Sequence, residues 1–259
     1  MRSSSLGQVS ARVRLDWGPA AVRETVHGAD LAVVVDVLSF TTTVSVALDG
    51  GAEVHPYQWA DDTAAEYARA HQATLAVGRL EARDSGNVAS VSLSPATIRS
   101  SSGLSRLVLP SPNGSTISAR LAEGGAGVVA ASLRNRSAVA EWLTDRLHAD
   151  PSSAVTVIAA GERWPDGSLR PAVEDLWGAG SVIAALGDHG VSSLSPEAAT
   201  AVAAFDSVWP GIDGSLLRCA SGRELAEKGF EADVLVAAEV DMSACVPLLR
   251  DGRFVDAAA

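Results

Sequence analysis

The chain has 259 residues, of which 47% are hydrophobic and 20% are charged, and this balance excludes an intrinsically disordered protein. Its 31 acidic and 20 basic residues give a net charge of −11, which argues against a nucleic-acid-binding protein, because phosphate backbones are held by Lys and Arg. No segment approaches the roughly 20 uninterrupted apolar residues of a membrane helix, and the N-terminus lacks the apolar run of a signal peptide. We therefore expect a cytoplasmic protein without a membrane partner.

Short Val-rich runs alternate with Ala-rich amphipathic stretches along the chain, which is the pattern of an α/β fold. Most of the runs are continuously apolar, so we expect strands that are buried on both faces. The predicted strands span 31–37, 53–57, 74–78, 106–110, 127–132, 154–161 and 233–239. The predicted helices span 41–49, 60–71, 115–123, 136–148, 173–186, 196–208 and 221–228. This order predicts a three-layer α/β/α architecture with a mostly parallel or mixed sheet.

A polar segment, "HADPSS" at 148–153, is the best candidate for a seam in the chain. It divides an N-terminal α/β half, 1–149, from a C-terminal α/β half, 150–259, and we expect the two to interlock as one compact unit. The two cysteines, Cys219 and Cys245, have neither a C-x-x-C spacing nor a metal-ligand spacing. We predict that both are buried free thiols in a reducing compartment.

The first candidate site follows the strand "LAVVV", where Asp36 precedes a cluster of hydroxyls that opens a helix. Ligands of open α/β sheets bind beyond the carboxyl ends of the strands, and an Asp there can hold a divalent cation. The hydroxyls of Thr41 and Thr42, with the helix amides, could bind an anion. They could equally be ordinary capping residues.

The second candidate, "LVLPSPNGSTISARL" at 107–121, repeats this design of strand, polar loop, hydroxyl and helix. Asn113 and Gly114 form the turn, and Ser115 opens the helix. An Asn-Gly turn is also common on protein surfaces, but two such loops in one sheet strengthen the functional interpretation.

Two further segments carry charges at helix entrances. In "AASLRNRSAVAEWL", Arg134 and Asn135 precede a helix and could bind an anion, or the arginine could pair with nearby acids. In "RPAVEDLWGAG", Glu174 and Asp175 lie in a first turn, where paired acids commonly complement the helix dipole. If that helix faces Asp36, the three carboxylates form an oxygen-rich Mg²⁺ site.

The ordered series of these segments resembles the 2-phosphosulfolactate phosphatase family of Mg²⁺-dependent enzymes. The resemblance runs almost end to end, through "VVVDVLSFTTTVSVALDGGA", "PNGST", "ASLRNRSAVA", "AAGE", "EDLWGAG", "SPEAATA", "SGRELAEKGFEADV" and "DMSACVPLLRDGRF". It implies a three-layer α/β fold and hydrolysis of 2-phospho-3-sulfolactate to sulfolactate and phosphate, a reaction of coenzyme M biosynthesis.

The chain departs from the family pattern at Ser39, where the family usually has Arg, at Arg79, where it tends to have Glu, and at Leu93, where it has Asn. A substrate with phosphate, sulfonate and carboxylate needs several cationic contacts, which Arg79, Arg134 or Arg136 could supply. The departures leave two alternatives open: a non-catalytic protein that binds a small anion, and a phosphatase for another small phosphoacid.

Our hypothesis is a Mg²⁺-dependent phosphatase that acts on a small-molecule phosphate ester. Three carboxylates are the predicted catalytic and metal-binding residues: Asp36, Glu174 and Asp175. The predicted substrate-binding residues are Thr41, Thr42, Asn113, Gly114, Ser115, Arg134 and Asn135. The missing second acid two positions after Asp36 favours attack by metal-activated water. A homodimer is expected only from the prevalence of two-fold oligomers.

Overall fold

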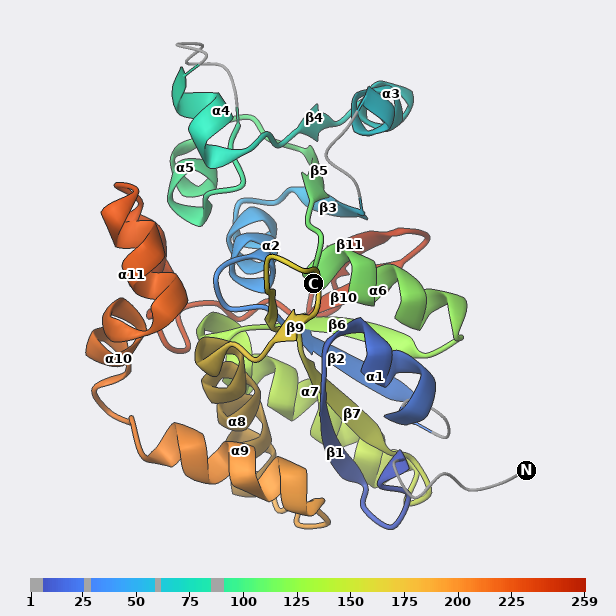
Figure 1. Cartoon of the computed structure of the whole chain (residues 1–259). Helices are drawn as coiled ribbons and strands as arrows, with labels where there is room; N and C mark the ends of the chain where they lie inside the picture. The colour runs from blue at the N-terminus through green and yellow to red at the C-terminus, as the bar shows by residue number, and fades with distance from the viewer. Residues whose placement is uncertain (1–6, 26–28, 59–61, 85–90) are drawn as a thin grey trace.

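The computed structural model describes residues 7–25, 29–58, 62–84 and 91–259, and it confirms the three-layer α/β/α architecture (Figure 1). Its main sheet has nine strands in the order β1-β7-β2-β6-β10-β11-β3-β5-β4. These strands are β1 (Val13–Trp17), β2 (Leu31–Val35), β3 (Glu53–Tyr57), β4 (Thr74–Leu75), β5 (Arg106–Pro110), β6 (Gly127–Ala131), β7 (Val155–Ala159), β10 (Pro247–Arg250) and β11 (Arg253–Asp256). A separate small hairpin pairs β8 (Glu162–Arg163) with β9 (Leu169–Arg170).

The helices flank this sheet and connect its strands. The first six are α1 (Gly18–Thr25), α2 (Phe40–Asp49), α3 (Asp62–Ala70), α4 (Arg79–Asp84), α5 (Pro95–Ser100) and α6 (Gly114–Glu123). The others are the 3₁₀ turn η2 (Leu133–Asn135), α7 (Arg136–Ala149), α8 (Val173–Asp188), α9 (Pro196–Asp206), α10 (Ile212–Arg218), α11 (Ala220–Glu227) and α12 (Glu231–Ala237).

The sheet is mixed. Strands β1, β7, β2 and β6 run parallel to one another, and so do β3, β5 and β4. The antiparallel hairpin β10–β11 lies between these two groups. Strands from both sides of position 150 belong to this one sheet, and the division into two halves at that position stays a prediction.

Strand β2 shows why the sheet needs a helical layer on each face. Val33 and Val35 belong to the core that α7, α8 and α9 cover, whereas Ala32 and Val34 belong to the core beneath α1, α2 and α6 (Figure 1). All four side chains are fully buried, as the continuous apolar run predicts. Burying both faces fixes β2 firmly, so the residues after Val35 start from a rigid strand end.

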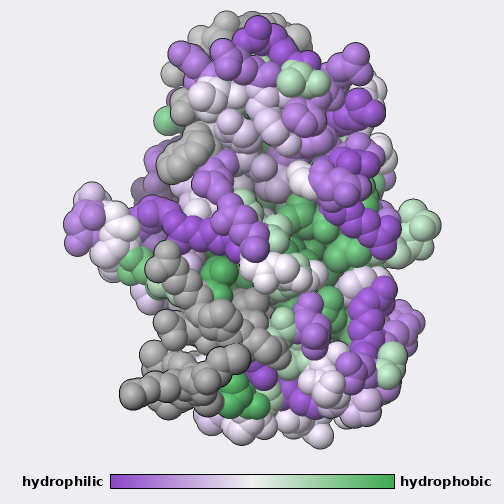
Figure 2. Space-filling view, turned by 90° about the vertical axis from the view of Figure 1, so that its right-hand side faces the viewer, coloured by the Kyte–Doolittle hydropathy of each residue, from purple (hydrophilic) through white to green (hydrophobic). Residues whose placement is uncertain are grey.

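The outer surface is richer in polar side chains than this core. Figure 2 shows one face on which hydrophilic residues dominate, with hydrophobic residues gathered mainly near its middle. No helix among residues 7–25, 29–58, 62–84 and 91–259 is long and apolar enough to span a bilayer. Cys219 and Cys245 are buried and unbridged, as predicted.

The prediction of a strand at 233–239 is wrong, because residues 231–237 form α12. Val234 and Ala237, three positions apart, both face the core that α7, α8 and α9 cover, and this spacing belongs to a helix. Tertiary packing therefore overrides the strand propensity of Val234 and Val236.

The predicted helix at 60–71 corresponds to α3, and its residues 60 and 61 lie outside the described residues.

Candidate active site

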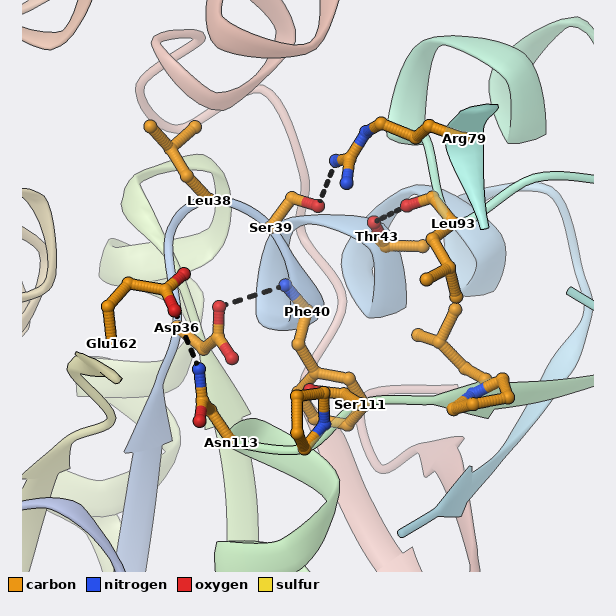
Figure 3. Close-up of a pocket in the computed structure, with 13 residues that line it drawn as sticks. Asp36, Leu38, Ser39, Phe40, Thr43, Arg79, Leu93, Ser111, Asn113 and Glu162 are labelled. Atoms are coloured by element: carbon orange, nitrogen blue, oxygen red, sulfur yellow. Dashed lines mark hydrogen bonds between the residues drawn. The ribbon is translucent and has the colours of Figure 1, made fainter. Parts of the chain in front are cut away.

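A pocket of about 160 Å³ lies between the segment that follows β2 and the end of β5 with its following loop (Figure 3). Its lining combines two carboxylates, one guanidinium group, hydroxyls and apolar side chains: Asp36, Leu38, Ser39, Phe40, Thr43, Arg79, Leu93, Leu109, Pro110, Ser111, Pro112, Asn113 and Glu162. Asp36 and Asn113 therefore share one pocket although 77 positions separate them in sequence.

Asp36 is held by backbone amides from two loops. The N–H of Phe40 donates to Oδ1 at 3.1 Å, and the N–H of Gly114 donates to Oδ2 at 3.1 Å. These amides belong to the first residues of α2 and α6, so both helix dipoles favour a negative charge here. The structure thus joins the two loops that the sequence paired by their similar design.

The predicted anion-binding hydroxyls of Thr41, Thr42 and Ser115 form hydrogen bonds with backbone groups of the loops. Thr41 Oγ1 donates to the carbonyl oxygen of Asp36 at 2.8 Å and accepts from the Asp36 N–H at 3.0 Å. Thr42 Oγ1 donates to the carbonyl oxygen of Val37 at 2.8 Å, and Ser115 Oγ donates to that of Leu109 at 3.0 Å. Thr41, Thr42 and Ser115 are fully buried and absent from the pocket lining. Their contacts fix the position of the site's backbone.

Glu174 and Asp175, at the start of α8, are buried and do not line the pocket. Asp175 Oδ1 accepts the N–H of Val37 at 2.7 Å, and Oδ2 accepts the N–H of Gly161 at 2.8 Å. Asp175 therefore links the β2 and β7 strand ends. Glu174 Oε2 has no hydrogen-bond partner in the described part of the chain.

Glu162 is a pocket residue that the sequence-based site omitted. Its Oε2 accepts from Asn113 Nδ2 at 3.1 Å (Figure 3). Asn113 Oδ1 in turn accepts from Arg163 Nε at 3.2 Å. Glu162 directly follows Gly161 at the carboxyl end of β7, in the segment "AAGE". An acid just beyond a buried parallel strand is the same signal that identifies Asp36.

These carboxyl groups shift one another's titration. Burial, reinforced by the charge of Glu162, raises the pKa of Asp36 to about 7. Burial also raises the pKa of Glu162, and burial followed by the charge of Asp36 raises the pKa of Asp175. Such a cluster is costly to ionise without a compensating cation.

A divalent cation suits this donor set. Mg²⁺ prefers oxygen ligands and is commonly held by only one or two protein carboxylates together with substrate phosphate. Asp36 and Glu162 line the pocket. Glu174 lies outside the lining, and its Oε2 has no hydrogen-bond partner among the described residues. Within the described ranges, no group of three or more His, Cys, Asp or Glu side chains is arranged as a metal site. Asp36 and Glu162 are thus the carboxylates of the described pocket lining that could contact such a cation.

Arg134 and Asn135 lie away from the pocket. Buried Arg134 pairs with Asp49 and Glu239, so it contacts the C-terminal end of α2, whereas the pocket lies at the N-terminal end. Asn135 Oδ1 accepts the N–H of Ser132 at 2.9 Å, and Nδ2 donates to the carbonyl oxygen of Cys245 at 3.2 Å. Both side chains tie structural elements together, which matches the alternative of acid pairing for Arg134.

The chain matches the family model described as 2-phosphosulpholactate phosphatase over residues 19–252. It is 30% identical to a probable 2-phosphosulfolactate phosphatase of Thermus thermophilus, covering 95% of this chain and 97% of the relative. It is 29% identical to the 2-phosphosulfolactate phosphatase of Methanothermobacter thermautotrophicus, covering 95% of each chain, and 33% identical to a probable one of Parasynechococcus marenigrum, covering 84% and 88%. With its α/β/α fold and the match across nearly its whole length, the chain belongs to the 2-phosphosulpholactate phosphatase family.

Proposed function

We propose that this protein is a Mg²⁺-dependent phosphatase that hydrolyses 2-phospho-3-sulfolactate to sulfolactate and phosphate, as in coenzyme M biosynthesis. The observation that carries the proposal is the meeting of Asp36 and Glu162 in one pocket, with backbone amides from α2 and α6 holding Asp36. Family membership supports the phosphatase assignment.

Asp36 and Glu162 would contact the ion in the pocket. The negative charge of Glu174, which lies outside the pocket lining, would also attract the ion. Bound there, Mg²⁺ would offset the acidic cluster and draw electron density from the phosphate, which eases attack on phosphorus. Unlike Asp36, Asp175 does not line the pocket, and its two oxygens accept the backbone N–H groups of Val37 and Gly161, so we assign it a positioning role and not a place among the ligands.

The contacts of Asp36 favour direct hydrolysis by water. Each of its oxygens already accepts one backbone N–H, which makes the carboxylate a poorer nucleophile. In the proposed step, a water oxygen bonds to phosphorus and the bond from phosphorus to the ester oxygen breaks. The proton that the water gives up is taken up by the ester oxygen as sulfolactate leaves. Asn113 donates a hydrogen bond to Glu162 and holds this carboxylate in place during the step.

Phosphate release by the purified protein tests the proposal. The substrates are 2-phospho-3-sulfolactate, 2-phospholactate and 3-phosphoglycerate, each assayed with Mg²⁺ and with EDTA. We expect Mg²⁺-dependent release with preference for the sulfonated ester. Release that persists in EDTA contradicts the metal assignment, and binding of all three esters without release at any divalent cation indicates a non-catalytic anion-binding protein.

A further inference from the structure

Among the described residues that line the pocket, Arg79 alone is basic. It is the first residue of α4 and also borders a second pocket of about 350 Å³, which shares Leu38 and Glu162 with the first. Arg79 therefore stands where the two pockets join. Figure 3 shows Asp36 and Glu162 on one side of Ser39 and Arg79 on the other.

Two hydrogen bonds fix the Arg79 guanidinium. Nε donates to Asp233 Oδ2 at 2.6 Å, and Nη2 donates to Ser39 Oγ at 2.5 Å. Asp233 is itself buried and accepts from Ser94 Oγ and from the N–H of Ala96. Nη1 has no hydrogen-bond partner in the part of the chain that the structure describes. The guanidinium is thus pre-oriented while its outer N–H groups stay available for a ligand.

The charges of the pocket indicate which part of a substrate the Arg79 guanidinium binds. Asp36 and Glu162 make the other side acidic, so it would repel any anionic group that a bound cation does not hold. A planar guanidinium matches the oxygens of a sulfonate or a carboxylate, and its hydrogen bonds to an ionised group are stronger than neutral ones. A substrate with an acid group beside its phosphate would therefore place that group at Arg79.

We infer that Arg79 is a specificity residue that binds a second oxyanion of the substrate, a sulfonate or a carboxylate, across the pocket from the phosphate. This inference rests on the proposed function for the identity of the substrate. It explains how an acidic pocket in a chain of net charge −11 can accept a multiply charged anion. It also selects against simple phosphate monoesters, which would leave the outer N–H groups of Arg79 unpaired.

The Arg79–Asp233 pair could also serve only to tie α4 to α12, and the experiment must separate the two roles. Calorimetry in the presence of Mg²⁺ would measure binding of sulfolactate, lactate and inorganic phosphate to the wild-type protein and to Arg79→Gln and Arg79→Lys. Lactate keeps the carboxylate and lacks the sulfonate, so it shows which oxyanion Arg79 binds. Because Arg79→Gln leaves Asp233 buried without its cation, the double variant Arg79→Gln/Asp233→Asn guards against misfolding.

Arg83→Gln is the matched control, because Arg83 lies on the same helix and at the same 5.9 Å from the Phe230 ring but outside both pockets. We expect Arg79→Gln to weaken sulfolactate binding roughly 10- to 100-fold, with phosphate binding within about twofold of wild type. Arg79→Lys should recover part of this loss, and Arg83→Gln should bind like wild type.

Equal losses for sulfolactate and phosphate in the double variant would assign Arg79 a structural role and overturn the inference. Unchanged sulfolactate affinity, or no sulfolactate binding by the wild-type protein, would overturn it as well. The measurement does not depend on turnover. If the wild type binds sulfolactate through Arg79 but releases no phosphate, the phosphatase proposal fails and the role of Arg79 stands. If phosphate is released and Arg79→Gln binds sulfolactate and phosphate as the wild type does, the phosphatase proposal stands and the role of Arg79 fails.

Discussion

We expect the substitution Gly114→Ala, which adds a single methyl group, to disturb the position of Asp36 in the candidate site. A Cβ placed there would lie 2.2 Å from Phe40 Cδ1 and 2.9 Å from Asp36 Oδ2. The Phe40 ring is buried and packs edge-to-face on Phe254 with their centroids 6.1 Å apart, so it has little room to retreat. Gly114→Ala would therefore push α6 away from α2 and disturb the amide that holds Asp36.

The contact distances set the size of the effect. The ring would have to retreat by about 1.2 Å to reach the 3.4 Å of ordinary contact. Overpacking of this kind costs about 1–3 kcal/mol, or a fall in melting temperature of about 2–10 °C for a chain of this size. A displacement of about 1 Å in a catalytic group commonly costs about 100-fold in rate. We thus expect kcat to fall about 100-fold while most of the protein stays folded at 25 °C.

Phosphate release and thermal unfolding, measured on the same preparation, check this prediction. Gly187→Ala is the matched control, because Gly187 lies in α8 with no atom within 4 Å of an added Cβ. That variant should keep full activity and gain up to about 1 kcal/mol from helix propensity. Wild-type activity and melting temperature in Gly114→Ala would refute the close packing of α6 on Phe40 and Asp36.

Three further predictions follow from the site. Glu162→Gln should lower both Mg²⁺ affinity and kcat at least about 10-fold, measured by Mg²⁺ titration of phosphate release; unchanged Mg²⁺ dependence would exclude Glu162 as a ligand. The pKa of Asp36 is about 7 in the folded protein against about 4 when unfolded, so metal-free protein should lose up to about 4 kcal/mol of stability between pH 4 and pH 7. Urea unfolding in EDTA should show a smaller loss for Asp36→Asn than for the wild type, since Glu162 and Asp175 keep pKa values raised by burial, and a parallel pH dependence in the two proteins would contradict the prediction. Arg134→Met should cost about 1–3 kcal/mol, because it removes the buried cation that pairs with Asp49 and Glu239, although Glu239 keeps its pair with Arg99. It should preserve the KM of the folded fraction, and a raised KM would return Arg134 to the substrate site.

The position of the site could be predicted because it depends on strand ends. Asp36 follows a strand buried on both faces, and the loop of Asn113 follows another, so the carboxyl-end rule identifies both. The same rule could have identified Glu162 after β7. The roles of Thr41 and Thr42 could not be predicted, since a hydroxyl at a helix start can bond either a ligand or the backbone, and only the fold decides.

Two strand features and one contact were not predicted from the sequence, and each has its own physical reason. The β10–β11 hairpin has a two-residue Asp251-Gly252 turn with φ of 48° and 77°, and an Asp-Gly pair is a recognisable hairpin signal. Strand β1 alternates apolar residues with Arg14 and Asp16, as expected at a sheet edge, and lacks the continuous apolar run of the inner strands. The contact of Arg79 with Asp233 joins residues 154 positions apart, a distance at which single-sequence patterns carry no information.

Phosphate release from 2-phospho-3-sulfolactate, compared between the wild-type protein and Asp36→Asn, tests the central claim most directly. Asp188→Asn, an exposed acid at the end of α8, controls for the loss of one negative charge. The proposed site predicts Mg²⁺-dependent release by the wild type and by Asp188→Asn, and a loss of at least about 100-fold in Asp36→Asn with the fold intact by circular dichroism. Undiminished release by Asp36→Asn would contradict the assignment of this pocket as the active site.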